Sequence, residues 1–358
     1  MRICAYRGYA TRTRVFVFGR VLANKSPAEL TERESLWRNL LNAYRRFETD
    51  EVPNVPVVIR FEGREHIVQT DAEGYYDFEL PRVQQSKETS LTIEARCKLR
   101  GEEVSATHDI VAPTSDAGFG IISDLDDTII ETNMTSLLTA AKLTFIGNAK
   151  TRKPLDGAAA LYASLGSGRA GRPVNPIFYV SSSPWNLYDL LCDFMELNEI
   201  PKGPIFLRDW GIDRKRFMKA RDHRDKLDRA LKIMADFPEL PFVLVGDSGQ
   251  HDAGLYAEAA TLHPDRIKAI YIRDVDPATA TTRDDQVRAH IKTAAQHGVP
   301  MLLAPDSHAM AQHAIALGLI SPRKEAEVRV EVAKDQERPS PGAAAVTEAL
   351  GIETSRAT

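Results

Sequence analysis

Carboxylates that follow a short apolar run are the most distinctive chemical feature of the sequence. Gly120-Ile121-Ile122-Ser123 leads directly into Asp124, Asp126 and Asp127, and Thr128 completes a DxDxT motif. A β-branched apolar run predicts a buried strand, so these acids lie where the backbone leaves the core. Carboxylates this close repel one another unless protons or a cation neutralise them, and oxygen ligands of this kind suit Mg²⁺. The pattern predicts a metal-assisted phosphoryl-transfer site.

The spacing of Asp124 and Asp126 fits a two-step hydrolysis of a phosphoester. A carboxylate nucleophile, Asp124, accepts the phosphoryl group, and water then releases it. On an extended backbone a residue two positions further points to the same side, so Asp126 can protonate the leaving alkoxide and later deprotonate the water. The alternative is a strand followed by an acidic turn without chemistry, and further motifs must decide between the two.

Two later segments supply groups that bind a phosphate. Tyr179-Val180-Ser181 ends a strand-like run, where the hydroxyl of Ser181 can bind a phosphoryl oxygen. The following serines begin a predicted helix whose free N–H groups favour phosphate, although Ser182 can instead simply cap that helix. Lys226 can offset the negative charge of nucleophile and phosphate, whereas a lysine near a helix start is more commonly solvated.

A second acidic motif follows another apolar run. Phe242–Val245 leads into Gly246-Asp247, with His251 and Asp252 shortly after. We expect Asp247 to bind Mg²⁺ together with Asp124, the backbone carbonyl of Asp126 and water. Asp252 is expected to orient these ligands from behind, and Thr128, Ser182 and His251 to lie near the ligands or the substrate.

In this order the four motifs resemble those of the haloacid-dehalogenase-like phosphatase superfamily. More specifically, YVSSSPWNLYDLL, GPIFLRDWG, FPELPFVLVGDSGQHD and IYIRDV are similar to the catalytic domain of the actin-patch phosphatidate phosphatase family, over about residues 119–275. The resemblance implies Mg²⁺-dependent removal of phosphate from phosphatidate, which leaves diacylglycerol. The chain has Asp225-Lys226 where the family is expected to have His-Lys.

The surrounding pattern predicts two folding units and a tail. Residues 1–113 contain alternating apolar and polar runs, which predict an antiparallel β-sandwich, and their TDxxGYY turn resembles that of transthyretin-like modules. Residues 114–322 alternate apolar strands with helices, which predicts a doubly wound parallel α/β sheet; with the resemblance, this is a haloacid-dehalogenase-like fold. Ile129–Asn175, with a helix over Ala158–Leu165, would form a small cap over the site. We expect residues 323–358 to be disordered.

Composition limits the compartment and the partners. The chain has 358 residues, of which 43% are hydrophobic, and its net charge of −4 indicates no nucleic-acid partner. Three cysteines without CxxC spacing predict reduced thiols in the cytoplasm, and neither a signal peptide nor a membrane-spanning run is predicted. Contact with a membrane surface would need a local basic face, for which Lys215, Arg216, Lys219 and Arg221 are candidates, although such runs are more commonly solvated helix faces.

Three classes of function remain on this basis. The first is a lipid phosphatase acting on phosphatidate or a related lipid phosphate, and the second a phosphatase for a soluble phosphomonoester or a phosphoprotein with the same motifs. The third is a non-catalytic interaction protein, against which the intact acids argue. The sequence indicates no oligomeric state.

Overall fold

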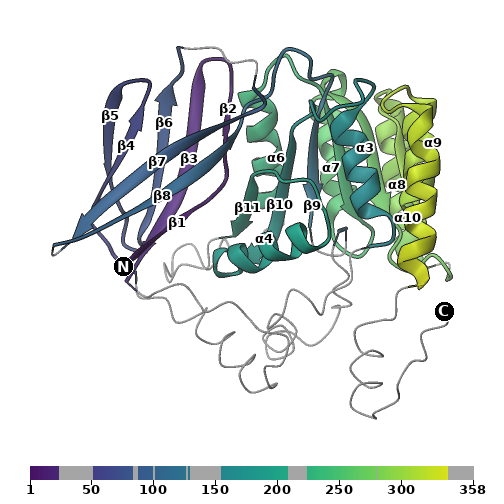
Figure 1. The fold of residues 1–358 in the computed structure, drawn as a ribbon. Helices are drawn as coiled ribbons and strands as arrows, with labels where there is room; N and C mark the ends of the chain where they lie inside the picture. The colour runs from purple at the N-terminus through teal and green to yellow at the C-terminus, as the bar shows by residue number, and fades with distance from the viewer. Residues whose placement is uncertain are drawn as a thin grey trace, which may run out of the picture.

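Two β-sheets organise the protein (Figure 1). The structure, a computed structural model, describes residues 1–23, 51–83, 88–99, 101–125, 128–129, 155–208, 224–279 and 281–337. Within these residues an eight-stranded sheet, here called the N-terminal sheet, precedes a six-stranded parallel sheet. The N-terminal sheet ends at Val111 and the parallel sheet begins at Gly120, so the change of architecture falls between them.

The N-terminal sheet contains β1 to β8, in the order β1-β3-β2-β8-β7-β4-β5 with β6 paired to β3. Its neighbouring strands pair antiparallel, except β2 and β8, which run parallel. The alternation of apolar and polar residues predicts strands at about residues 15–21, 57–61 and 91–99, and these are present as β3, β4 and β7. The bounds are β1 Arg2–Ala5, β2 Gly8–Ala10, β3 Arg14–Leu22, β4 Pro56–Phe61, β5 Arg64–Gln69, β6 Tyr75–Pro81, β7 Ser90–Leu99 and β8 Glu102–Val111.

This sheet closes around its own core. Val15 and Val17 of β3 share a buried cluster with Ile59 of β4 and Ile93 of β7, so the two layers expected of a sandwich face each other but belong to one hydrogen-bonded sheet. The turn before β6 is built by Asp71, whose Oδ1 accepts the N–H groups at positions 73 and 75.

The parallel sheet has the strand order β11-β10-β9-β12-β13-β14, and all its pairs are parallel. The chain order therefore reverses between β9 and β12, which is where doubly wound sheets bind ligands. The apolar runs predict six strands, at about residues 118–123, 176–181, 204–208, 241–246, 268–273 and 300–303, and all six are present. Their bounds are β9 Gly120–Asp124, β10 Ile177–Pro184, β11 Ile205–Arg208, β12 Phe242–Asp247, β13 Ile267–Arg273 and β14 Met301–Ala304.

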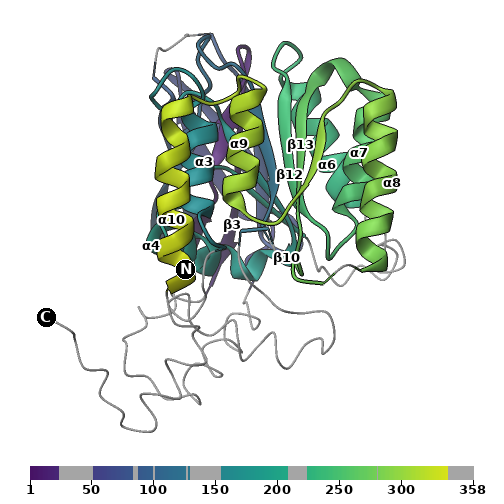
Figure 2. The ribbon, with the colours of Figure 1, turned by 90° about the vertical axis from the view of Figure 1, so that its right-hand side faces the viewer.

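Helices cover both faces of the parallel sheet (Figure 2). Successive strand residues face opposite layers, so Ile121 packs with the first group of helices and Ile122 with the second. The first group is α3 Ala158–Ser167, α4 Tyr188–Leu197, α9 Ser307–Ala316 and α10 Glu325–Glu337. The second is α6 Arg224–Asp236, α7 Asp252–Leu262 and α8 Thr282–Gln296. None of the described helices is long and apolar enough to cross a membrane.

Helix α3 corrects the prediction of a cap that extends from Ile129 to Asn175. Leu161, Tyr162 and Leu165 are buried with Tyr179 of β10, so α3 is a core helix of the first layer. The sheet, α9 and α10 cover nearly the whole apolar face of α3, and this burial fixes its position in the layer. Residues 130–154, which also belonged to the predicted cap, lie outside the described residues.

Helix α10 corrects the prediction of disorder from residue 323 onward. Val328 and Val332, four positions apart, are buried in the first layer, and the Asp335 Oδ2 accepts the Gly157 N–H at 2.9 Å. Two apolar residues in a charged segment gave a weak sequence signal, although i and i+4 lie on the same helix face. Residues 338–358 lie outside the described residues.

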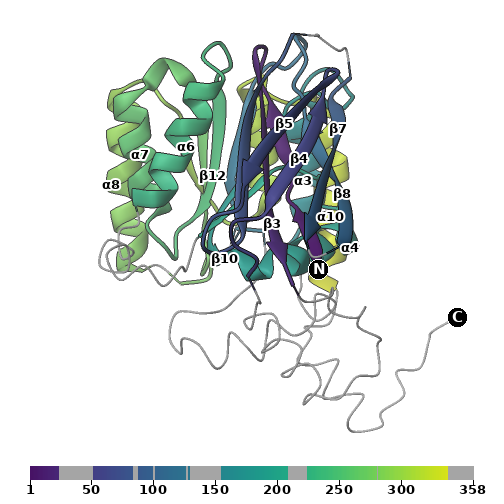
Figure 3. The same ribbon diagram turned by 90° about the vertical axis from the view of Figure 1, so that its left-hand side faces the viewer.

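The N-terminal sheet packs against the β11 edge of the parallel sheet, where Tyr9 and Phe18 contact Phe206 of β11 (Figure 1). Figure 3 shows the molecule from the side of the N-terminal sheet. Tyr6 belongs to the buried cluster of the first helix layer, whereas Tyr9 belongs to that of the second. The short segment that carries both tyrosines therefore reaches both faces of the parallel sheet at its edge.

Candidate active site

The carboxyl ends of three neighbouring strands present polar residues at one level. Val180 of β10 lies opposite Asp124 of β9, so Ser181 stands one position further along its strand. On the other side Val245 of β12 lies opposite Ser123, so Asp247 also stands one position beyond the level of Asp124. The predicted convergence of Asp124, Ser181 and Asp247 at this edge follows from the register of the sheet.

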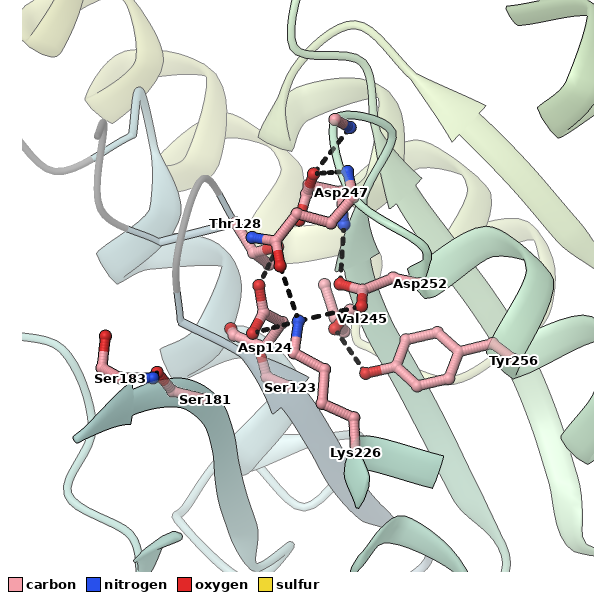
Figure 4. A network of polar contacts seen from close by, with 12 residues as sticks. Ser123, Asp124, Thr128, Ser181, Ser183, Lys226, Val245, Asp247, Asp252 and Tyr256 are labelled. Carbon is pink, nitrogen blue, oxygen red and sulfur yellow. Dashed lines mark hydrogen bonds and ion pairs between the residues drawn. The ribbon is translucent and has the colours of Figure 1, made fainter. Parts of the chain in front are cut away.

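Asp124, Asp247 and Asp252 form a compact group, here called the acid cluster. One side-chain oxygen of each lies within 4.8 Å of the others, and all three residues are 0% exposed. The ammonium of Lys226 lies 2.8 Å from Asp124 Oδ1 and 3.0 Å from Asp252 Oδ1 (Figure 4). Each of these buried charges stabilises the other, because removing one partner would leave an unpaired charge in the protein interior, which is strongly destabilising.

Lys226 reaches the acid cluster from the first turn of α6. Leu227 and Ala230 bury the adjoining face of this helix, and so fix the direction of the lysine side chain. Burial by itself lowers the pKa of the Lys226 ammonium, but the carboxylates of Asp124 and Asp252 outweigh burial and raise that pKa above its ordinary value. The interpretation of Lys226 as a solvated surface lysine is therefore wrong.

A tight turn after β12 orients Asp247. Its Oδ1 accepts the N–H groups of Gly249 at 2.6 Å and Gln250 at 2.8 Å, while its own N–H donates to Asp252 Oδ2 at 3.3 Å. Asp252 approaches this closely because Gly246 has no side chain: a Cβ there would lie 2.6 Å from the Cβ of Asp252. The amide oxygen of Gln250 accepts from Lys226 at 3.2 Å, a contact that the sequence reasoning missed.

Ser181 is buried within β10, one position beyond the level of Asp124 on β9, and its Oγ accepts the Ser183 N–H at 2.9 Å (Figure 4). The prediction that a helix begins at the serines is wrong. Strand β10 continues to Pro184, a 3₁₀ turn covers Trp185–Leu187, and α4 begins only at Tyr188. Ser182 and Ser183 therefore do not cap a helix, and their backbone remains extended.

Tyr162 lies behind the proposed nucleophile and was not identified from the sequence. Its hydroxyl lies 2.5 Å from Ser123 Oγ, which in turn donates to the backbone carbonyl of Asp124 at 2.6 Å. Because the single proton of Ser123 is used in that bond, Tyr162 is the donor of the other. Burial raises the pKa of Tyr162, which keeps the phenol protonated. No spacing in the sequence relates a helix residue to this strand.

The residues predicted to lie near the ligands or the substrate differ in their exposure. Thr128 is buried, with its Oγ1 3.5 Å from Asp124 Oδ2. His251 directly precedes α7 and is exposed, and Ser182 is partly exposed. Asp126 lies outside the described residues, as do the basic candidates Lys215, Arg216, Lys219 and Arg221.

The donor chemistry of the acid cluster fits a divalent cation. When Asp124, Asp247, Asp252 and Lys226 are all ionised, three negative charges and one positive charge leave a net charge of −2. Hard oxygen ligands on a buried site with this charge suit Mg²⁺. Asp252 is held by Lys226 and by the Asp247 backbone. That it supports the metal ligands from behind stays a prediction.

The acid cluster, Ser181 and Lys226 all lie between residues 119 and 274. Residues 119–274 match the family model "Phosphatidate phosphatase APP1, catalytic domain". This part of the chain is similar to a phosphatidate phosphatase catalytic domain. The resemblance to the phosphatidate phosphatase catalytic domain, which the motifs indicated for about these residues, is confirmed.

Two fungal relatives extend the similarity. The chain is 30% identical over 240 residues to "Phosphatidate phosphatase APP1" of Saccharomyces cerevisiae, which covers 63% of this chain and 39% of the relative. It is 27% identical over 215 residues to an uncharacterized protein of Schizosaccharomyces pombe, which covers 58% of this chain and 34% of the relative. The chain thus spans less than half the length of the curated relatives it matches.

Solved structures add no argument about function. A carbohydrate acetylesterase from Xanthomonas citri aligns over 81% of this chain and 72% of its own, with 14% identity and a TM-score of 0.24. At that score the alignment supports neither a shared fold nor a shared activity.

Proposed function

We propose that the protein is a Mg²⁺-dependent phosphatidate phosphatase that works through an aspartyl phosphate on Asp124. The observation that carries the proposal is the acid cluster with its buried lysine, which lies inside the stretch that matches the catalytic-domain family. Buried carboxylates gathered around a lysine at the carboxyl ends of parallel strands are typical of active sites, so the cluster favours a catalytic role over a structural one.

In the proposed reaction a carboxylate oxygen of Asp124 bonds to phosphorus as the bond from phosphorus to the lipid oxygen breaks. Asp126 donates a proton to that oxygen, and diacylglycerol leaves. Asp126 then takes a proton from a water whose oxygen attacks phosphorus, which breaks the bond to Asp124 and releases phosphate. Asp124 and Asp126 are thereby returned to their starting states.

The other residues of the site position and neutralise the reacting groups. Lys226 holds Asp124 and balances part of its charge, and the Ser181 hydroxyl binds a phosphoryl oxygen. Asp124, Asp247 and the backbone carbonyl of Asp126 would hold Mg²⁺, which when bound offsets the charge of the phosphoryl group. The turn of Gly249 and Gln250 keeps Asp247 directed toward this position.

We also propose a haloacid-dehalogenase-like fold for the residues from Gly120 onward. The support is the strand order, with Asp124 on β9 and Asp247 on β12 at the two sides of the reversal point. A cytoplasmic protein that visits a membrane surface would meet its lipid substrate there, and the basic residues from Lys215 to Arg221 remain the candidates for that contact.

A substrate comparison tests the proposal directly. The full chain would be assayed for phosphate release from phosphatidate in mixed micelles, and from a sugar phosphate, a nucleotide and a phosphopeptide, with Mg²⁺ and with EDTA. We expect phosphatidate to give the highest kcat/KM, a rate that depends on its surface concentration, and loss of activity in EDTA. A far higher kcat/KM on a soluble phosphomonoester or on the phosphopeptide would replace the lipid reading by that alternative.

A further inference from the structure

The turn that follows Ser181 is held by the N-terminal sheet. The β10–α4 turn, Trp185–Leu187, directly follows β10. The Trp185 ring stacks on Tyr6, with centroids 4.4 Å apart and planes 23° from parallel. Tyr6 also packs on Tyr188 with centroids 4.5 Å apart, and the Arg7 N–H donates to the Tyr188 hydroxyl at 2.7 Å. Aromatic pairs with such separations are favourable beyond the area they bury.

A buried arginine makes a second connection at the same turn. Arg20 of β3 is 5% exposed, and its guanidinium donates to Asn186 Oδ1 at 3.3 Å and to the Glu73 carbonyl at 2.7 Å. The same guanidinium lies 4.4 Å from the centre of the Tyr75 ring. Arginine is rarely buried unless it is paired, so this position of Arg20 depends on partners from both sheets.

The serines that precede this turn lie where strand β10 changes its register. The register of β10 with β11 is broken between Val180 and Pro184, and its pairing with β9 ends at Val180 among the described residues. The Ser181 Oγ also accepts the Ser183 N–H at 2.9 Å, so a shift of the turn that begins two residues after Ser183 would reach the Ser181 hydroxyl. That turn is fixed by Tyr6 and Arg20.

We propose that the N-terminal sheet is a positioning element of the active site. Tyr6 and Arg20 are positioning residues: they hold Trp185 and Asn186, and through them keep the Ser181 hydroxyl where it meets the phosphate. The inference rests on the proposed function, because it assigns the phosphoryl group to Ser181. It adds that the residues matching the catalytic-domain family are not sufficient for full phosphate binding without β1 to β3.

The dissociation constant of inorganic phosphate, measured by calorimetry on the full chain in Mg²⁺, tests this inference. Ser181→Ala gives the reference loss, and Tyr6→Leu removes the stacking partner of Trp185. Phe16→Leu is the matched control: Phe16 and Tyr6 are both 4% exposed, but Phe16 stacks on Tyr9 in the second helix layer, away from the turn. Tyr6→Phe keeps the aromatic ring.

We expect Ser181→Ala, which removes a hydrogen bond to a charged group, to weaken phosphate binding by about tenfold or more. Tyr6→Leu should weaken it by about threefold to thirtyfold, the range that indirect couplings span. Phe16→Leu and Tyr6→Phe should bind as wild type does, even where the thermal midpoint of Phe16→Leu falls. If Tyr6→Leu fails to fold, Arg20→Met and Asn186→Ala replace it. Their effects on phosphate binding should then not add, because both remove the same contact.

The outcomes separate the two proposals. Suppose that Ser181→Ala binds phosphate more weakly than wild type. If Tyr6→Leu then binds as wild type does, or if the effects of Arg20→Met and Asn186→Ala add, the positioning role is overturned and the proposed function is left intact. An equal loss in Phe16→Leu would reduce the effect to general destabilisation and also overturn it. Unchanged binding in Ser181→Ala, or no binding by wild type, would remove the assignment of phosphate to Ser181 on which the inference depends.

Discussion

The acid cluster and the His108–Tyr76 pair are both buried polar groups, but they differ in charge. His108 of β8 is 0% exposed, with Nε2 2.8 Å from Tyr76 Oη and Nδ1 2.9 Å from the Tyr6 carbonyl. A neutral imidazole that donates from Nδ1 and accepts at Nε2 satisfies both contacts. The acid cluster instead holds three carboxylates around one ammonium.

This difference shows how buried polar residues can be sorted. Burial lowers the pKa of His108, which favours the neutral form that its two partners satisfy. A neutral, fully paired group stabilises a fold and needs no ligand. In the acid cluster three carboxylates face one ammonium, a balance that favours cation binding or chemistry over a purely structural role. We therefore expect changes to the acid cluster to affect activity, and changes to His108 to affect stability.

The largest effect is expected from neutralising the proposed nucleophile. Asp124→Asn should abolish turnover while leaving the fold intact, because an amide of nearly the same shape is a poor nucleophile. Phosphate release and the circular dichroism spectrum would be measured on the same sample. Appreciable turnover by correctly folded variant protein would assign the nucleophile to another residue.

Asp126→Asn should lower the rate by about two to four orders of magnitude, the usual contribution of general acid–base catalysis. The loss should be smaller for p-nitrophenyl phosphate than for an alkyl phosphate, because an aryl leaving group barely needs a proton. Both substrates would be compared at saturating Mg²⁺. Equal losses on the two substrates would show that Asp126 is not the acid for the leaving group.

Asp247→Asn should raise the Mg²⁺ concentration needed for half activity by about tenfold or more, because it removes one anionic ligand from the acid cluster. The control is Asp276→Asn, since Asp276 is an exposed acid in the loop after β13. Mg²⁺ titrations of both variants would be compared with wild type. A metal requirement unchanged in Asp247→Asn would place the metal elsewhere.

The smallest effect is expected at His108, in the stability rather than the activity of the protein. Burial depresses its folded-state pKa below the ordinary value, so the unfolded state binds more protons as the pH falls through that range. His108 therefore favours the folded state fully above about pH 6.5 and progressively less below it. The free energy of unfolding, measured in urea, should fall more steeply toward acid pH for wild type than for His108→Gln.

The partly exposed His66 of β5 provides the control for that experiment. His66→Gln should retain the wild-type dependence of the unfolding free energy on pH. If His108→Gln also retains it, the neutral buried imidazole is not the source of the acid sensitivity, and the contrast with the acid cluster loses its second member.

Much of the site could be predicted because it lies at the ends of apolar strands. The run before Asp124 and the run before Asp247 each indicate a buried strand, and parallel strands bring their carboxyl ends to one edge. Lys226 was expected to offset the charge of the nucleophile, and its ammonium lies 2.8 Å from Asp124 Oδ1. Spacing along the chain could not give the distances between the carboxylates, nor the contacts of Asp252 with Lys226 and Asp247.

The failures have a common physical cause. The helix predicted to start at the serines begins later, because β10 pairs once more at Pro184 before the chain turns. Helix α3 was placed in a cap because its period shows one apolar face without showing which surface covers it. Helix α10 was missed because its stability depends on burying Val328 and Val332, not on local propensity.

The sequence by itself determined the strands and the acids that end them, since alternation and apolar runs depend on neighbouring residues along one chain. Only the tertiary structure decided what lies beside these acids. The Tyr162 hydroxyl behind Asp124 and the stacking of Tyr6 on Trp185 join segments far apart in the chain. Such contacts depend on how the layers pack, and packing is a property of the whole fold that local periodicity does not contain.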